Sequence, residues 1–288
     1  MRRFLLLCVD FDETITRRDT ISLLLQLSSC SAMCQQQLVT QYVDEMSEFL
    51  EAYNAKWELC TSVTRGVDAV GLHAFLKGYA ATDLRSLERV VKSRALEGIC
   101  HCDVAQAAST VPIRPHCAET LAAVDEWTVI SANWSTRLVS SVLTQSGISI
   151  APLDTAAIVG NEMHVDAHGV TTGAIDVKVQ SPADKARCVK AARLKRAEMQ
   201  PTVMYVGDSA NDVLAMLEAD VGVWLVVDST SSSSLLGRLL RAYRIDVRPL
   251  MTCSSIAECV ATTSRRPTVF TMTDWAQLKE LVEKAHSE

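Results

Sequence analysis

The 288-residue chain has no apolar run approaching the roughly 18–20 residues that a helix needs to cross a bilayer. It also has no excess of basic residues, since 28 lysines and arginines face 34 aspartates and glutamates and leave a net charge of −6. Nucleic-acid-binding proteins usually present a basic stripe, and here only short pairs such as Arg17–Arg18 occur. We therefore expect neither a membrane nor a nucleic acid as a partner, whereas a small phosphorylated metabolite requires no positive net charge.

The chain also lacks the spacing of a disulfide framework, although it contains ten cysteines. The Cys-x-Cys at Cys100–Cys102 is a poor match to zinc-binding pairs, so we expect reduced thiols and a cytoplasmic protein. The basic and apolar start up to Val9 imitates a secretion signal. It ends at Asp10, however, before the ~7–15 apolar residues and cleavage site of a true signal. A buried β-strand explains this stretch better.

Three short apolar runs end abruptly in acidic, glycine or hydroxyl residues: Phe4–Val9 before Asp10, Trp127–Ile130 before Ser131, and Thr202–Val206 before Gly207-Asp208. The runs do not alternate between polar and apolar residues, which is typical of strands covered on both faces in a parallel sheet. Helical patterns separate them, for example over residues 136–146 and 183–197. Strand–helix alternation of this kind predicts an open α/β fold.

One long segment, residues 20–109, shows helical spacing and no convincing strand. It lies between the first and second predicted strands and far exceeds the length of an ordinary connection. We therefore predict an all-helical subdomain inserted over residues 17–109, with a core built from residues 1–16 and 110–288. The aromatic residues Trp57, Phe75 and Tyr79 are expected to form the core of this subdomain or, alternatively, to line a substrate pocket within it. Residues 156–179 predict a hairpin.

The first predicted strand is followed by two carboxylates, Asp10 and Asp12. In an open α/β sheet, ligands bind outside the carboxyl ends of the strands. Two carboxylates held this close repel each other, and a divalent cation would relieve that repulsion. The same pair suits a nucleophile and a proton-transferring group. Taken alone, such a pair could equally be solvated turn residues.

The other strand ends carry matching chemistry. Gly207 is followed by Asp208 and Asp212, whose oxygens are ligands of the kind Mg²⁺ prefers, although Asp212 could instead cap the next helix. Ser131 offers a hydroxyl and free backbone amides for phosphate oxygens. Lys185 stands at the start of a predicted helix, where its ammonium could neutralise an anion or remain a surface charge.

Together, these elements resemble the haloacid dehalogenase superfamily of phosphotransferases. Its motifs are Asp-x-Asp-x-Thr, a strand-terminal Ser or Thr, a Lys, and Gly-Asp-x-x-x-Asp after a strand. In this chain they are met by Asp10, Asp12 and Thr14, by Ser131, by Lys185, and by Gly207, Asp208 and Asp212. The resemblance extends from Phe4 to about Val227 and implies a Rossmann-like core with the helical insert as a C1 cap, as in phosphoserine phosphatase.

The resemblance also implies roles for the matched residues. Asp10 would attack phosphorus and form an aspartyl-phosphate, while Asp12 would protonate the leaving alcohol and then activate water. Mg²⁺ would be held by Asp10, the backbone carbonyl of Asp12 and Asp208. Ser131 and Lys185 would grip the phosphoryl group, with Thr14, Gly207 and Asp212 in support. The acid at position 12 points to a phosphatase, because dehalogenases of the family lack it.

The substrate is less well defined by the sequence. The turn that begins at Ser131 continues with Ala132 and Asn133 where the family often has two glycines, which alters the lining of the substrate pocket. Asp19 lies near the place of a cap glutamate that phosphoserine phosphatases use for the substrate amine. Arg17 and Arg18 either contact a second anionic group of the substrate or form salt bridges at the hinge surface.

We therefore predict a Mg²⁺-dependent phosphatase of small phosphomonoesters, with phosphoserine and thiamine monophosphate as narrower alternatives. A phosphotransferase of the same fold, which passes the phosphoryl group to an acceptor alcohol, remains open. So does a non-catalytic sensor or scaffold. The sequence gives no indication of the oligomeric state.

Overall fold

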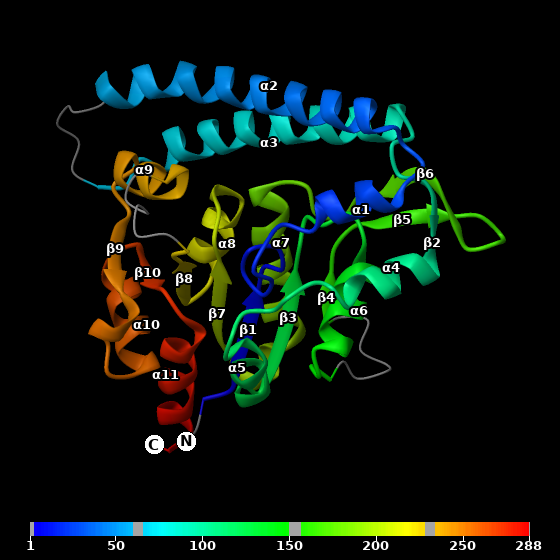
Figure 1. Ribbon diagram of the computed structural model, residues 1–288. Helices are drawn as coiled ribbons and strands as arrows, with labels where there is room; N and C mark the ends of the chain where they lie inside the picture. The colour runs from blue at the N-terminus through cyan, green and yellow to red at the C-terminus, as the bar shows by residue number, and fades with distance from the viewer. Residues whose placement is uncertain (1–2, 60–65, 150–156, 228–233, 288) are drawn as a thin grey trace.

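The computed structural model describes residues 3–59, 66–149, 157–227 and 234–287 (Figure 1). A seven-stranded sheet in the order β4-β3-β1-β7-β8-β10-β9 forms its centre, and each neighbouring pair of strands is parallel. The predicted α/β class is therefore confirmed. The strands are β1 (Leu5–Val9), β3 (Glu126–Ile130), β4 (Ile158–Val159), β7 (Thr202–Gly207), β8 (Val221–Leu225), β9 (Asp246–Pro249) and β10 (Thr268–Met272).

Helices cover both faces of this sheet, which explains the continuous apolar runs in its strands. In β1, Leu5 and Leu7 pack into the cluster on one face, and Leu6 and Cys8 pack into the cluster on the other. The first face is covered by α5 (Cys117–Ala123), α6 (Thr136–Gln145), α10 (Ile256–Arg265) and α11 (Trp275–Ser287). The second face is covered by α7 (Pro182–Lys195), α8 (Val213–Glu218) and α9 (Leu235–Ala242).

The segment between β1 and β3 forms a lid over the sheet. It contains α1 (Ile21–Leu27), α2 (Ala32–Leu59), α3 (Ala69–Lys92), β2 (Glu97–Cys100) and α4 (His101–Ala108). Figure 1 shows α2 and α3 lying side by side across the carboxyl ends of the strands. Phe75 is fully buried among these elements, as expected, whereas the side chain of Trp57 lies outside the described residues. Despite their length, none of the described helices meets the requirements of a membrane span.

One short strand, β2, lies in the segment that was expected to contain only helices. It pairs antiparallel with β6 (Val170–Asp176), which in turn pairs with β5 (Glu162–Val165) in the expected hairpin. The amide of Ile99 donates to the Thr171 hydroxyl at 2.9 Å. A four-residue strand that contains a glycine is too short to show an alternation of polar and apolar residues, so the sequence does not indicate it. Its strand conformation depends on pairing with the hairpin about 70 residues further on.

The chain enters and leaves the lid through two adjacent segments. Thr16 and Ile113 form an isolated antiparallel bridge between them. The guanidinium of Arg114 donates twice to the carbonyl of Glu13, at 3.0 and 2.8 Å, and so fastens the loop after β1. The indole of Trp275, at the start of α11, donates to the Thr14 carbonyl of the same loop at 3.1 Å. Segments distant in sequence thus fix the position of this loop.

Candidate active site

The carboxyl ends of three adjacent strands bring the predicted acidic and hydroxyl residues together. Asp10 follows β1, and β1 lies between β3, which leads into Ser131, and β7, which leads into Asp208. The Asp10 amide donates to the Val206 carbonyl at 2.9 Å, which extends the β1–β7 ladder by one residue. Asp10 and Ser131 are both buried. The parallel arrangement therefore concentrates functional groups at one edge of the sheet.

Lys185, near the start of α7, joins Asp10 after β1 to Asp212 after β7. A capping box between Ser181 and Asp184 sets the start of α7 and thereby the position of Lys185 in its first turn. The Lys185 Nζ lies 2.8 Å from Asp10 Oδ1 and 2.7 Å from Asp212 Oδ1, and the residue is only 1% exposed. Burial opposes the ammonium charge, but the two carboxylates outweigh it and hold the pKa of Lys185 above its usual value.

Asp212 is saturated with hydrogen bonds. Its Oδ1 accepts from Lys185 and the Tyr205 hydroxyl, both at 2.7 Å, and its Oδ2 accepts from the amides of Asp208 and Ser209 and from the Ser209 hydroxyl. Burial raises its pKa, but Lys185 and these donors leave the pKa below the usual value. Asp212 is therefore a fixed counter-charge for Lys185.

The close packing around Asp212 also explains the glycine at the end of β7. A Cβ atom at Gly207 would lie 2.4 Å from Cγ of Asp212. No real Cβ contact is this short, so a side chain at Gly207 would displace Asp212. The structure thus gives Gly207 a steric function.

Asp10 and Asp208 have oxygen atoms left for another ligand. Among the described residues, Lys185 contacts Oδ1 of Asp10, and the Thr14 hydroxyl donates to Oδ1 of Asp208 at 2.8 Å. Burial raises the pKa of Asp10 to about 7, with Lys185 lowering it and Asp212 raising it. Burial, Asp212 and Asp10 raise the pKa of Asp208 well above its usual value. Two buried carboxylates this close disfavour double ionisation unless a cation joins them.

The geometry of these oxygens fits a divalent cation. One oxygen from each of Asp10, Asp208 and Asp212 can be chosen so that all lie within 4.8 Å of one another. Carboxylate oxygens are the ligands that Mg²⁺ prefers. Because the oxygens of Asp212 are already occupied by donors, Asp10 and Asp208 are the better candidates for direct contact with a cation.

Asp12 lies in a different environment from Asp10. Its Oδ1 accepts from the Thr20 amide and hydroxyl at 2.8 and 2.7 Å, and its Oδ2 accepts from Asn133 Nδ2 at 2.8 Å. Burial and the charge of Asp19 raise its pKa, while these donors lower it, to give a value of about 6. A carboxyl group with this pKa can both donate and accept a proton near neutral pH.

Two residues that position these groups were not predicted from the sequence. Thr20 orients Asp12 and also accepts a hydrogen bond from Asn133 at 2.8 Å. Asn161 is buried and donates from Nδ2 to the carbonyls of Ala132 and Val179, while its Oδ1 accepts from the Val179 amide. It thereby joins the turn after β3 to the segment before α7. Neither residue belongs to a local pattern, because each acts through partners far away in sequence.

A cavity of about 540 Å³ opens between this strand edge and the lid, and we call it the inner cavity. Asp10, Asp12, Lys185 and Asp208 line it from the core. The predicted substrate-binding residues Ala132, Asn133 and Asp19 also line it, and Ser131 lies beside them. Arg17 and Arg18 are not among the described residues that line it; both are exposed, and Arg18 donates to the Thr110 carbonyl at 3.2 Å.

Tyr79 fits both interpretations that the sequence left open. It packs against the buried cluster that contains Phe75, and it also lines the inner cavity alongside Tyr42 and Asp83. A single helical face of α3 carries both Phe75 and Tyr79, four residues apart. Which of them borders the cavity depends on how far α3 extends across the sheet, and the sequence does not contain that information.

Comparisons with known proteins agree with this geometry. A family model described as haloacid dehalogenase-like hydrolase matches residues 7–217. The bifunctional TH2 protein, mitochondrial, of Arabidopsis thaliana is 25% identical over 260 residues. That alignment covers 79% of this chain and 40% of the relative, so the chain spans about two fifths of the relative's length.

Two solved structures share the fold. Cytosolic 5′-nucleotidase IIIB bound to cytidine is 14% identical, with a TM-score of 0.56 over 99% of this chain and 88% of the nucleotidase. A substrate-bound phosphoserine phosphatase is also 14% identical, with a TM-score of 0.53 over 84% of this chain and 91% of that protein. At these identities the likeness concerns the fold alone.

Proposed function

The chain belongs to the haloacid dehalogenase-like hydrolases, and on that basis we propose that it is a Mg²⁺-dependent phosphatase of small phosphomonoesters. The observation that carries the proposal is the contrast between the buried carboxylate of Asp10 and the half-buried carboxylate of Asp12. Asp10 faces Lys185 at 2.8 Å, whereas Asp12 is held by neutral donors and has a pKa of about 6. One carboxylate is thus suited to nucleophilic attack and the other to proton transfer.

In the first step of the proposed reaction, a carboxylate oxygen of Asp10 attacks phosphorus and the bond from phosphorus to the leaving oxygen breaks. The leaving alkoxide takes a proton from the Asp12 carboxyl group. In the second step, Asp12 takes a proton from water as the water oxygen attacks phosphorus. The bond between phosphorus and Asp10 then breaks, which releases inorganic phosphate and restores both carboxyl groups to their starting states.

The remaining residues of the site stabilise charge in this scheme. Ser131 and Lys185 would hold oxygens of the transferring phosphoryl group, where negative charge is concentrated in the transition state. Asp10 and Asp208, together with the Asp12 backbone carbonyl, would hold Mg²⁺, which supplies positive charge between the carboxylates and the phosphate. Thr14 fixes Asp208, and Asp212 fixes Lys185.

We further propose that residues 17–109 act as a cap that closes over the bound substrate and excludes bulk water. The inner cavity supports this proposal, because α2 and α3 contribute one wall and the strand ends contribute the other. An enclosed cavity of this size suits a small metabolite. The cytoplasmic location predicted from the sequence stays a prediction, which imaging of the tagged full-length protein would test.

The test is hydrolysis of an aryl phosphate by the purified protein, measured with Mg²⁺ and again with excess chelator. The proposal requires turnover with Mg²⁺, its loss with chelator, and its recovery when Mg²⁺ is restored. Turnover that yields a phosphorylated acceptor alcohol in place of inorganic phosphate would favour a phosphotransferase. Absence of turnover under both conditions would contradict an enzymatic function.

A further inference from the structure

The wall of the inner cavity opposite the strand ends combines aliphatic side chains with one acidic and aromatic cluster. Tyr42 of α2 and Tyr79 and Asp83 of α3 line it, and Asp19 lies near its edge. The Tyr42 hydroxyl donates to Asp83 Oδ1 at 3.0 Å, and Tyr79 lines the cavity beside them. Burial raises the pKa of Asp83 to about 6, and Tyr42 lowers it, so the carboxylate is ionised at neutral pH. We call Tyr42, Tyr79 and Asp83 the distal cluster.

Among the described residues that line the cavity, no lysine or arginine pairs with the Asp83 carboxylate of the distal cluster. Among the described residues that line it, Lys185 is the only lysine or arginine, and its ammonium is already bound to Asp10 and Asp212. Arg17 and Arg18 do not line the cavity either. At the inner end, a phosphate and a divalent cation would balance the charges of the site. At the distal end, the carboxylate of Asp83 has no such balance among the described residues.

A separate observation also points to a ligand that donates hydrogen bonds. Asn211 lines the same cavity, and its Oδ1 is buried without a hydrogen-bond donor among the described residues. A buried acceptor left without a donor costs about 1–3 kcal/mol, which a donor on the ligand would relieve. Asn211 belongs to the turn η2 (Ala210–Asp212), which follows β7, and so lies on the core side of the cavity, where η2 meets α3. The core wall thus offers an acceptor without a donor, and the cap wall offers the carboxylate of Asp83.

The size of the cavity sets a further limit on the ligand. About 540 Å³ lies within the roughly 300–1,000 Å³ of typical small-molecule sites and well exceeds a phosphate ion. Tyrosine rings beside a carboxylate attract cations, because the ring faces carry negative electrostatic potential. A carboxylate on the ligand would instead meet Asp83 and Asp19 with no cation to receive it.

We propose that the substrate is a phosphomonoester whose body carries a positively charged group and no carboxylate, and that the distal cluster receives this positive group. The proposal rests on the phosphatase function proposed above and specifies its substrate class. It disfavours a phosphorylated amino acid, since the α-carboxylate of such a substrate would need a basic partner in the inner cavity.

The experiment compares three aryl phosphates of similar shape: para-trimethylammoniophenyl, para-tert-butylphenyl and para-carboxyphenyl phosphate. They carry a positive, a neutral and a negative group at the same position. The readout is the ratio of kcat/KM for the cationic probe to that for the neutral probe, with Mg²⁺ present. We expect the carboxylate probe to be the poorest substrate of the wild-type protein.

Two variants separate recognition from the intrinsic reactivity of the probes. Asp83→Asn removes the charge but keeps an oxygen for Tyr42, and Tyr42→Phe removes only the hydroxyl. Because the reactivity of each probe is the same for all proteins, the change in the ratio isolates the contribution of the cavity. We expect Asp83→Asn to lower the ratio about tenfold to a hundredfold, as for a lost charge-assisted contact, with Tyr42→Phe intermediate.

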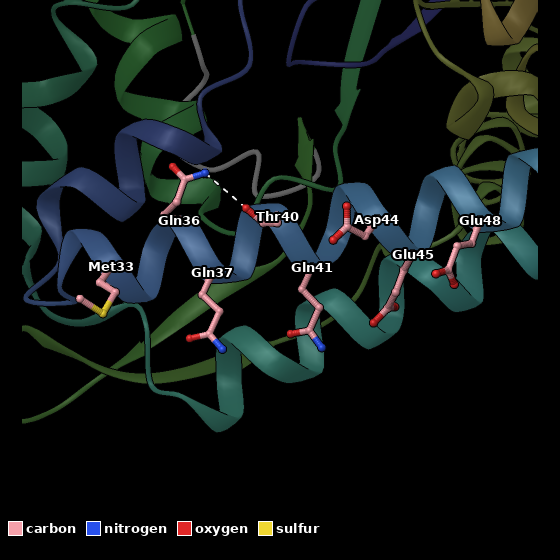
Figure 2. A pocket seen from close by; sticks show the side chains of 8 residues that line it. All are labelled: Met33, Gln36, Gln37, Thr40, Gln41, Asp44, Glu45 and Glu48. Carbon is pink, nitrogen blue, oxygen red and sulfur yellow. Dashed lines mark hydrogen bonds between the residues drawn. The ribbon is translucent and has the colours of Figure 1, made fainter.

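The matched control lies on the other side of α2. Figure 2 shows the outer groove along this helix, where Asp44 is exposed beside Gln41 and Glu48. Asp44 is two positions from Tyr42 and therefore points to nearly the opposite side of α2. None of the residues that line the outer groove lines the inner cavity. Asp44→Asn should leave the ratio at the wild-type value.

The outcomes distinguish this proposal from the one on which it rests. Equal kcat/KM for the three probes, or preference for the carboxylate probe, would overturn the substrate class while the phosphatase function stands. A ratio unchanged in Asp83→Asn would overturn the assignment of the distal cluster. If the wild-type protein hydrolysed none of the probes with Mg²⁺, the phosphatase function itself would fail, and the substrate class with it.

Discussion

The core wall and the cap wall of the inner cavity differ in how their charges are paired. On the core wall, Lys185 contacts both Asp10 and Asp212 within 2.8 Å, and Asp212 accepts five hydrogen bonds. On the cap wall, Asp83 accepts one hydrogen bond from the described residues, donated by the Tyr42 hydroxyl. The core wall is therefore preorganised, as charge stabilisation during phosphoryl transfer requires. The cap wall is available to a substrate.

This difference follows from how the two walls are built. Asp10, Ser131 and Asp208 of the core wall lie directly after parallel strands, so the backbone ladder fixes them. Lys185 lies on α7 and is fixed by its ion pairs with Asp10 and Asp212. The residues of the cap wall lie on α2 and α3, which reach the cavity only through packing between the insert and the core. We propose that the core wall determines the chemistry and that the cap wall determines the substrate.

The largest effect should come from removing the nucleophile of the core wall. Asp10→Asn keeps the size of the side chain but removes its charge, and we expect kcat to fall by more than about 10³-fold. Aryl phosphate hydrolysis measures the loss, and circular dichroism with thermal unfolding checks the fold. Asp176→Asn, at an exposed carboxylate of β6, is the control and should retain full activity. Substantial residual activity in Asp10→Asn would remove Asp10 from the proposed mechanism.

The next effect concerns the pairing of charges on the core wall. Lys185→Met leaves Asp10 and Asp212 buried without their cation, which should lower the free energy of unfolding by about 3–5 kcal/mol. Urea unfolding measures this change, together with a large loss of activity. The control is Lys178→Met: the side chain of Lys178 is 60% exposed, and its Nζ lies 3.6 Å from Asp176 Oδ2. We expect the control to stay within about 0.5 kcal/mol of wild type. Equal stability of the two variants would refute preorganisation by Lys185.

Metal binding should depend on pH in a defined direction. The pKa of Asp10 is about 7 in the fold against 3.8 for an unperturbed aspartate, so without metal its contribution to stability is lost as pH rises from about 4 to 7. Mg²⁺ competes with protons for these carboxylates and should restore stability above that range. We expect a rise in Tm on adding Mg²⁺ at about pH 8 and little change at about pH 5.

The expected size of this thermal shift is several degrees. Saturation at about 100-fold the Kd adds about 2.7 kcal/mol, and each kcal/mol corresponds to about 2–4 °C in a protein of this size class. Asp208→Asn should abolish the shift, and the remote Asp176→Asn should preserve it. A shift that is larger at low pH, or that survives in Asp208→Asn, would place the cation elsewhere.

The smallest effect concerns a contact between the two walls. Gln180, on the segment before α7, donates from Nε2 to the Ala80 carbonyl of α3 at 2.8 Å. Gln180→Ala should cost about 0.5–1.5 kcal/mol in stability and raise KM more than it lowers kcat, because it loosens the cap wall alone. Gln145→Ala removes a similar bond to the Ala105 carbonyl, away from the cavity, and should leave KM unchanged. If Gln180→Ala lowered kcat and left KM unchanged, the assignment of substrate binding to the cap wall would be contradicted.

The same division explains what the sequence could predict. Asp10, Ser131 and Asp208 were recognisable because each follows an apolar run that forms a parallel strand. Strand order then brings them together without further information. Thr20 was not recognisable, since its contact with Asp12 depends on how the segment before α1 folds back over the loop after β1.

The cap wall was the part that sequence patterns described least well. The period of α3 indicates a helix but not which of its residues faces the cavity, so it left open whether Tyr79 packs in the core of the insert or lines a pocket. No sequence motif or spacing indicated a functional role for Asp83. The short strand β2 was missed because its partner β6 lies about 70 residues further along the chain. Each of these features depends on contacts between distant segments, which residue spacing alone does not specify.

The most direct test of the account is a search for the covalent intermediate on Asp10. Asp12→Asn should slow the hydrolysis of the phosphoenzyme, while an aryl phosphate with a good leaving group needs no proton from Asp12. After acid quench, intact-mass spectrometry should show one added phosphoryl group, located on the peptide that contains Asp10 and absent from the Asp10→Asn, Asp12→Asn double variant. A phosphoryl group on another residue, or one that persists in the double variant, would contradict the account.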